Sequence, residues 1–473
     1  SLFSETYRPP LFQLVVGLGS CLCRVVSMNC MIMSNVIFML GLLFSMYLIG
    51  RKVGGIACGL LAAFILSMLP GIFAFSRVPM PEFLLVTVVT MTYMFILYTE
   101  TLTKMRYSIL LGITIGCGML TKITYPAFVA LPLLMLLIKT GRIYYSDTKQ
   151  RTIIMINLFL VVIVTSVIAL WWYKAHIYEL TNLMPEQIFS DRNTNSASWF
   201  YIVAFALRQM YPFFYILFNL MVIGLLMEGR VNSVVKLLVN MIVPVLIICI
   251  AIAEEARFTI AILPFAALLI AQGLVVLRNK IVIIMVVIIA LFQCVSLSFY
   301  ENSIFRVMDI SIFNKINMQM NNRTRDNGLL HAAHDDWSAA KKICDIVKKD
   351  IDENKGRKSS IFFMDNLEKV FYGVWYLIFV TDLNCDITKF SEGVEWATPS
   401  SLEEYQKTFL KARILVIIAT ENYDDPYVKS EMKPLNYKRW QETRELFLKH
   451  KNNYVLLEEF TSGADVVHVY RKK

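Results

Sequence analysis

The stretch Ser76-Arg77-Val78-Pro79-Met80-Pro81-Glu82 lies between two long apolar runs, residues 54–75 and 83–98. It places an arginine and a carboxylate directly beside segments that are apolar enough to cross a bilayer. Ionisable groups at the edge of a membrane span commonly face a protein-lined or aqueous cavity, because contact with hydrocarbon is costly. The stretch alone fits two interpretations equally well. It is either part of a functional site or a short interfacial turn whose charged side chains face water.

The composition around this stretch is that of a polytopic membrane protein. Of the 473 residues, 57% are hydrophobic and only 17% are charged, and the mean hydropathy is +0.56. A soluble protein of this length carries more charge. The apolar runs end near residue 300, and ordinary charge density follows. We therefore expect a helical membrane domain over residues 1–300 and a soluble domain over residues 301–473.

The apolar runs predict one short helix followed by about ten membrane spans. The run at residues 11–23 is shorter than the ~20 residues that a span needs, so it predicts a juxtamembrane helix, re-entrant or interfacial. Spans are expected at residues 28–49, 54–75, 83–98, 107–120, 125–138, 153–172, 200–227, 234–253, 258–277 and 281–299. The two runs that flank Thr121-Lys122 are only ~14 residues long and predict a tight hairpin.

Alternate loops predict the orientation of these spans. One set of loops is rich in basic residues: Arg51, Lys52, Lys104, Arg106, Lys139, Arg142, Lys149, Arg151, Arg230, Lys236, Arg278 and Lys280. The positive-inside rule puts this set in the cytoplasm. It accounts for much of the net charge of +10, which therefore does not indicate a nucleic-acid partner. The soluble domain and residues 76–82 then lie on the extracytoplasmic face, where Trp171-Trp172-Tyr173 fits an aromatic belt better than a sugar-stacking platform.

The same outer face holds charged residues beside apolar runs. They are the cations Arg8, Lys122 and Arg257 and the carboxylates Glu5, Glu82, Glu254 and Glu255. Arginine and lysine suit a lipid phosphate, and a partly buried carboxylate suits removal of a proton from a hydroxyl. The alternative is a set of interfacial anchors and ion pairs that stabilise the bundle. That alternative explains any single residue better than a function does, but it explains their location on one shared face less well.

Four motifs, in this order, resemble membrane glycosyltransferases of the GT-C fold. They are Arg8-Pro9-Pro10-Leu11, Ser76-Arg77 followed by Glu82, Leu120-Thr121-Lys122, and Glu255-Ala256-Arg257-Phe258 with Pro264. The resemblance is to bacterial aminoarabinose transferases and protein O-mannosyltransferase-like proteins, including the dolichyl-phosphate-mannose-dependent type, and it runs from about residue 5 to residue 300. Residues 334–346 also resemble the start of the soluble domain that many bacterial members carry.

The resemblance implies transfer of a hexose or pentose from a polyprenyl-phosphate donor to a lipid, glycan or protein acceptor outside a bacterial or archaeal cell membrane. It implies that Glu82 is a catalytic acidic residue and that Arg8 lies near the lipid phosphate. The candidate substrate-binding residues are Arg8, Arg77, Lys122, Glu255 and Arg257.

One departure from the family pattern concerns its principal catalytic acidic residue. In the family this residue follows a first span, well before the Arg-Pro-Pro turn, and this chain has no such span before Arg8. We expect an N-terminally truncated chain rather than a lost activity, because the sequence opens in the middle of a loop. Glu5 is a weaker candidate for the role because it is so close to Arg8.

The last third predicts a small α/β domain. Helices are expected at residues 337–349, 402–411 and 440–450, and strands at 360–364, 414–419, 454–458 and 466–470. It contains neither a glycine-rich phosphate loop nor a nucleophile elbow, so it is assigned no chemistry of its own. Pairing of Cys344 with Cys385 stays open.

A metal requirement also stays open. No cofactor is implied with certainty, although a divalent metal would be compatible with the chemistry. The cluster His331, His334, Asp335 and Asp336 fits a junction loop with a helix cap better than a metal site.

Two other functions compete with sugar transfer. A transporter or flippase of lipid-linked saccharides would use the same phosphate-binding residues without breaking a bond, but it would place charges near the middle of its spans. Here the charges gather at one face. A non-catalytic scaffold would tolerate replacement of Arg8, Glu82 and Arg257.

Overall fold

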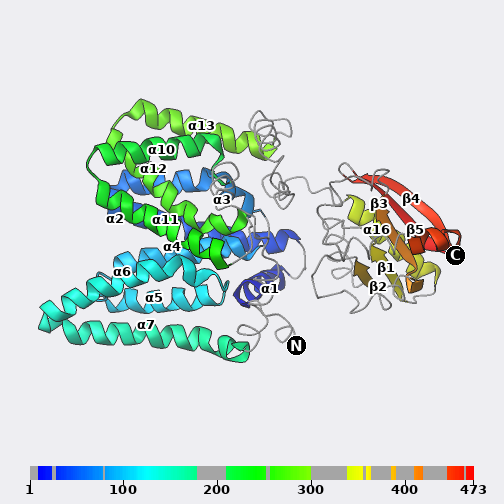
Figure 1. The fold of residues 1–473 in the computed structure, drawn as a ribbon, viewed down its shortest axis with the longest axis horizontal. Helices are drawn as coiled ribbons and strands as arrows, with labels where there is room; N and C mark the ends of the chain where they lie inside the picture. The colour runs from blue at the N-terminus through cyan, green and yellow to red at the C-terminus, as the bar shows by residue number, and fades with distance from the viewer. Residues whose placement is uncertain are drawn as a thin grey trace. The chain divides into compact units, whose positions relative to one another are not determined.

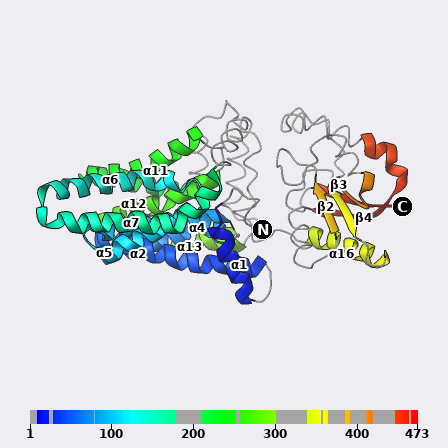
Figure 2. The ribbon, with the colours of Figure 1, turned by 90° about the horizontal axis from the view of Figure 1, so that it is seen from below.

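The computed structural model describes residues 9–23, 28–77, 80–177, 209–251, 256–299, 338–354, 358–363, 385–389, 410–418, 445–462 and 465–473. The chain divides into two compact units, Ser1–Ala333 and His334–Lys473. The first unit is a bundle of helices that run side by side, and the second is built on a β-sheet (Figures 1 and 2). The expected fold class, a helical membrane protein with a C-terminal α/β region, is confirmed.

The helices of the first unit follow the predicted apolar runs. They are α1 (Leu11–Cys23), α2 (Met28–Met68), α3 (Pro70–Phe75), α4 (Pro81–Tyr98), α5 (Met105–Met119), α6 (Tyr125–Ser146), α7 (Thr148–Ala175), α10 (Tyr211–Met227), α11 (Val231–Ala251), the 3-10 helix η3 (Ala256–Ile262), α12 (Leu263–Leu277) and α13 (Lys280–Phe299). Within the described residues, six helices are long and apolar enough to cross a membrane, and α5, α10 and α11 contain shorter apolar helices.

The helix α2 folds back on itself near its middle. Gly55 has φ 84° and ψ −178°, a backbone conformation that favours glycine. On the two sides of this turn, Gly50 and Gly59 approach so closely that a Cβ atom added to Gly50 would lie 2.7 Å from the Cα atom of Gly59. The turn follows Arg51 and Lys52, which the sequence placed between two spans.

Basic loops that were expected to share one face do meet. The Lys52 ammonium group donates a hydrogen bond of 2.8 Å to the Leu97 carbonyl oxygen near the end of α4. Glu100, in the α4–α5 turn, lies 3.5 Å from Lys52 and 3.8 Å from Lys104. The turn inside α2 and the α4–α5 turn therefore lie at the same end of the bundle, opposite the beginning of α4.

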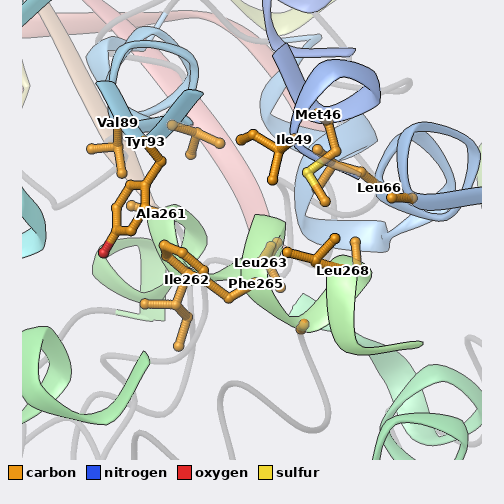
Figure 3. Close-up of a cluster of buried hydrophobic side chains, with 14 of the residues drawn as sticks. Met46, Ile49, Leu66, Val89, Tyr93, Ala261, Ile262, Leu263, Phe265 and Leu268 are labelled. Carbon is orange, nitrogen blue, oxygen red and sulfur yellow. The ribbon is translucent and has the colours of Figure 1, made fainter. Parts of the chain in front are cut away.

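The core of the bundle is formed by α2, α4, η3 and α12. Figure 3 shows Met46, Ile49 and Leu66 of α2 facing Leu263 and Leu268 of α12. The ring of Tyr93 on α4 meets the ring of Phe265 on α12 edge to face, with 4.5 Å between the ring centroids. This arrangement buries the helices that carry the predicted site.

Burial differs greatly between helices of similar hydropathy. The span that includes α12 has 83% of its most apolar window buried, whereas α7 has only 22%. Val167 and Leu170 on α7 and Ile281 and Ile284 on α13 are among the exposed large apolar side chains. Such surfaces require hydrocarbon around them, so these faces are suited to contact lipid.

The second unit contains a five-stranded sheet in the order β2-β1-β3-β5-β4. The strands are β1 (Ser359–Phe363), β2 (Cys385–Lys389), β3 (Ile414–Ile418), β4 (Tyr454–Ser462) and β5 (Asp465–Lys472). β1 pairs in parallel with β2 and β3, with Ile361 opposite both Ile387 and Ile414, whereas β5 is antiparallel to β3 and β4. The four predicted strands are all present, and β2 is an additional strand.

The helix α16 (Ser338–Glu353) covers one face of this sheet (Figure 2). Its apolar residues Ile343, Val347 and Ile351 recur every four positions and are buried. This spacing places them on one face of a helix, as the sequence predicted for this segment. The opposite face of the sheet is covered by Phe447, which packs with Tyr454 and Tyr470.

Candidate functional site

Glu82 lies in the first turn of α4 because of the prolines around it. Met80 has an extended backbone and Pro81 occupies the first helical position, where the missing N–H group removes no helical hydrogen bond. The first turn of a helix stabilises a carboxylate through its unpaired N–H groups and its dipole. The Glu82 side chain is only 3% exposed. The interpretation in which Glu82 faces water is therefore wrong.

Lys122 reaches Glu82 from the turn between α5 and α6. Its ammonium nitrogen lies 2.7 Å from Oε1 of Glu82, and its side chain is 18% exposed. The backbone N–H group of Tyr125 donates to the Lys122 carbonyl oxygen, and the Thr121 hydroxyl donates to the Cys117 carbonyl oxygen. The predicted short connection at Thr121-Lys122 is thus observed, although α6 continues to Ser146 rather than ending near residue 138.

This ion pair joins two parts of the chain forty positions apart at one end of the bundle. Breaking a buried pair by removing one partner costs about 3–5 kcal/mol, because the other charge remains buried. Removing either partner alone would therefore destabilise the fold, and the pair brings a carboxyl group and an ammonium group together at the end of the membrane spans. A carboxylate can act as a general base, and an ammonium group can bind an anion.

Two neighbouring helices position the turn that carries Lys122. The backbone N–H group of Leu11, the first residue of α1, donates a hydrogen bond of 2.9 Å to the Leu120 carbonyl oxygen. On the other side, the Tyr173 hydroxyl at the end of α7 donates one of 3.0 Å to the Met119 carbonyl oxygen. Trp172 is buried against Leu120. The predicted juxtamembrane helix thus exists, and its first residue contacts the site.

The aromatic residues at the end of α7 divide between two environments. Trp171 is among the exposed large apolar side chains, as an interfacial belt residue would be, whereas Trp172 is fully buried. The Tyr173 hydroxyl donates a hydrogen bond to the Met119 carbonyl oxygen, so this residue is more than an interfacial belt residue. The prediction of an aromatic belt is therefore wrong for Trp172, because this residue packs under the α5–α6 turn.

Arg77 occupies the turn between α3 and α4. The Asn35 side-chain amide of α2 donates a hydrogen bond of 3.0 Å to the Ser76 carbonyl oxygen and holds this turn. The Arg77 guanidinium group lies 5.2 Å from the centre of the Phe73 ring, within the range of a cation–π contact. Burial lowers the pKa of Arg77 from its ordinary value. Arg77 is half-buried in the α3–α4 turn. After Lys122, it is the second cation in the turns near the beginning of α4.

The other predicted site residues lie partly or wholly outside the described residues. Glu5, Arg8 and Glu255 lie outside them, and for Arg257 only the backbone, within η3, is described. η3 packs against α4. Of the predicted set, the structure brings together Glu82 and Lys122. Within the described part of the chain, no three histidine, cysteine or acidic side chains cluster to hold a metal ion.

Sequence reasoning missed the residues that position these loops. Asn35 is a buried polar residue inside an apolar run, a pattern that marks a function or a specific contact within a membrane protein. That signal was available in the sequence. Tyr173 carried no such signal, because an aromatic residue at the end of a span is ordinary.

The chain is similar in structure to solved proteins. ArnT from Cupriavidus metallidurans in the apo state aligns with a TM-score of 0.58 and 14% identity, over 99% of this chain and 88% of that chain. The same protein bound to undecaprenyl phosphate gives 0.58 and 14%, over 98% and 87%. The Archaeoglobus fulgidus oligosaccharyltransferase tethered to an acceptor peptide gives 0.47 and 13%, over 99% and 66%. No curated protein matches the chain in sequence.

The chain therefore shares the fold of ArnT, and its apolar helices indicate an integral membrane protein. Within it, residues 7–172 match the family model described as dolichyl-phosphate-mannose-protein mannosyltransferase. The matched segment contains Arg77, Glu82 and Lys122. The buried ion pair therefore lies inside the part of the chain that the family model recognises.

Proposed function

We propose that this chain transfers a sugar from a polyprenyl-phosphate donor to an acceptor at the extracytoplasmic face of the membrane. The observation that carries the proposal is the buried Glu82–Lys122 pair, within the segment that matches the mannosyltransferase family model. The complex of the similarly folded ArnT with undecaprenyl phosphate supports a polyprenyl-phosphate donor. The acceptor is a lipid, a glycan or a protein.

The proposed reaction assigns separate roles to the two partners of the ion pair. An acceptor hydroxyl attacks the anomeric carbon of the donor, and the bond from that carbon to the phosphate oxygen breaks. The polyprenyl phosphate leaves with the electron pair, and Glu82 accepts the proton of the hydroxyl. Lys122 compensates the charge of the phosphate, since an ammonium group has three donors and is not committed to one oxygen.

The remaining candidates extend this arrangement. Arg8, Arg77 and Arg257 are proposed to bind the donor phosphate, and Glu255 to contact the sugar or the acceptor. Glu5 is a further candidate for the base. Because η3 packs against α4, the backbone of Arg257 belongs to an element that contacts the helix of Glu82.

The test follows release of polyprenyl phosphate by the full-length gene product in proteoliposomes, because we expect the family's principal acidic residue to lie upstream of Arg8. Polyprenyl-phosphate hexoses and pentoses with a radiolabelled sugar are offered singly. Glu82→Gln keeps the shape of the side chain and removes the base, so we expect release to fall by about 10²–10⁴-fold. Glu100→Gln is the matched control, because Glu100 is an exposed carboxylate paired with Lys52 at the opposite end of the bundle.

Two results would overturn the proposal. One is equal release by Glu82→Gln and Glu100→Gln. The other is movement of the intact lipid-linked sugar across the bilayer without release of polyprenyl phosphate, which would identify a transporter.

A further inference from the structure

The second unit concentrates basic residues at one edge of its sheet. The parallel strands β2, β1 and β3 begin at this edge. β4 also begins here, and β5 ends here, because β5 is antiparallel to both β3 and β4. The end of α16 lies at the same edge, since Asp350 accepts a hydrogen bond from the hydroxyl of Ser359, the first residue of β1.

Segments far apart in the sequence supply these basic residues. We call the exposed lysines Lys348, Lys349, Lys358, Lys411, Lys449, Lys451, Lys472 and Lys473 the basic edge. Hydrogen bonds hold the segments together. The backbone N–H group of Lys472 donates to the Arg413 carbonyl oxygen, and that of Lys473 donates to the Asn453 carbonyl oxygen, both at 2.8 Å.

Two carboxylates at this edge are engaged by arginines, whereas the exposed Asp352 near the end of α16 offsets one of the lysines. Both oxygens of Asp350 accept hydrogen bonds from the Arg413 guanidinium group, at 3.0 and 3.1 Å. Glu353 pairs with Arg471. These pairs neutralise the arginines and the acids together, and the exposed lysines give the edge its positive charge.

Exposed apolar side chains lie beside the lysines. Leu448 is 58% exposed next to Lys449, and Val455 and Leu456 at the start of β4 are 46% and 45% exposed. Among the described residues of this region, the aromatic rings of Phe447 and Tyr454 are buried in the sheet core. Exposed leucines among lysines suit the headgroup region of a bilayer, whereas single-stranded nucleic acid is bound by exposed aromatic rings.

We propose that the basic edge binds the surface of an anionic lipid bilayer. Its lysines contact lipid phosphates and carboxylates, and Leu448 and Leu456 enter the headgroup region. A chain anchored in a membrane has a bilayer as a neighbour, and anionic lipids carry the charge opposite to that of the lysines. The proposal does not depend on the transfer reaction, and it assigns a role to a unit whose sequence shows no catalytic motif.

The test uses the full chain in nanodiscs of phosphatidylcholine, mixed with separate vesicles and recovered by flotation. We expect co-flotation with vesicles of phosphatidylcholine and phosphatidylglycerol, weak co-flotation with phosphatidylcholine alone, and loss of binding as salt is raised. The combined variant Lys449→Gln, Lys451→Gln, Lys472→Gln and Lys473→Gln should bind at least ~30-fold more weakly. Leu448→Ser should weaken binding about threefold to tenfold.

Two controls separate lost charge from lost structure. Replacing the same four lysines by arginine keeps the charge and should retain binding. Lys341→Gln with Lys342→Gln removes exposed charge from the other end of α16 and should also retain it.

Four outcomes would overturn the proposal. Three of them are equal binding to neutral and anionic vesicles, equal binding by wild type and the glutamine variant, and binding of heparin without binding of vesicles. The heparin result would identify a soluble polyanion as the partner. Self-association that requires the four lysines, without vesicle binding, would identify a second copy of the chain and would equally overturn it.

Discussion

Two buried carboxylates, one in each unit, are held in different ways. Asp350 is bound at both oxygens by the planar fork of Arg413 and also by the Ser359 hydroxyl. Glu82 receives the ammonium group of Lys122 at one oxygen. A guanidinium fork fixes a carboxylate in one geometry, whereas an ammonium group on a flexible stem can turn to another anion. The contrast fits a structural role for Asp350, and it is compatible with the proposed reaction, in which Lys122 turns toward the donor phosphate.

The largest effect is expected from removing the ammonium group at the membrane site. Lys122→Met leaves the Glu82 carboxylate buried without this partner, so we expect a loss of about 3–5 kcal/mol in stability. Thermal unfolding of the purified chain in detergent measures it. Lys52→Met is the matched control, because its partner Glu100 is exposed and such pairs contribute about 0–1 kcal/mol.

The double variant Glu82→Gln with Lys122→Met sharpens this test. It should unfold close to the wild-type temperature, because no buried charge is left alone, and it should remain inactive. Unfolding of Lys122→Met at the same temperature as Lys52→Met would show that the pair contributes nothing to the fold.

A smaller effect is expected at the structural carboxylate. Asp350→Asn removes the charge that Arg413 binds, which should cost about 2–3 kcal/mol within the second unit. Cys344 lies on the same helix as Asp350, α16, so the reactivity of its thiol measures how readily this helix opens. Burial raises the pKa of its thiol to about 12, so at pH 8 very little reactive thiolate is present until the helix opens.

Labelling of Cys344 with a maleimide, followed by mass spectrometry, measures that opening. Asp350→Asn should increase the labelling rate at pH 8 by about 30–150-fold, the ratio that corresponds to 2–3 kcal/mol. Sugar transfer per folded molecule should persist. If transfer is lost while the labelling rate stays unchanged, Asp350 is not the structural residue that this comparison assigns.

The smallest effect is expected from a residue that acts on the site at a distance. Tyr173→Phe removes only the hydroxyl that binds the Met119 carbonyl oxygen, so a stability loss of about 0.5–1.5 kcal/mol is expected. Because this bond positions the turn of Lys122, kcat should fall severalfold with a smaller change in KM for the donor. An unchanged kcat would show that Tyr173 contributes to packing and does not position Lys122 for the reaction.

The fold could be predicted from the sequence to a large extent because apolar length is a local property. The turn at Arg51-Lys52 and the helices beside it follow from composition alone. β2 was missed because Cys385-Asp386-Ile387-Thr388-Lys389 has little apolar character, and its pairing with β1 is a tertiary contact. The local sequence pattern therefore predicts where helices and strands occur better than it predicts which of them pack or pair together.

The sequence could predict which residues belong to the candidate site, but it could not predict how these residues are arranged in space. Glu82 and Lys122 stood out because charge beside an apolar run is unusual. Nothing in the sequence showed that these two would lie 2.7 Å apart, since that distance depends on how α4 packs beside the α5–α6 turn. The basic edge was less predictable still, because its lysines come together only through the order of the strands.

The burial of α12 has a consequence for how the chain is made. α12 leaves the ribosome after α2 and α10, yet it packs against both of them. Until residue 277 has entered the membrane, the faces of α2 and α10 that receive α12 can meet only lipid or other proteins. The Glu82–Lys122 pair lies earlier in the chain and can form before this happens. A nascent chain can thus acquire its buried ion pair well before the central helix that completes its packing.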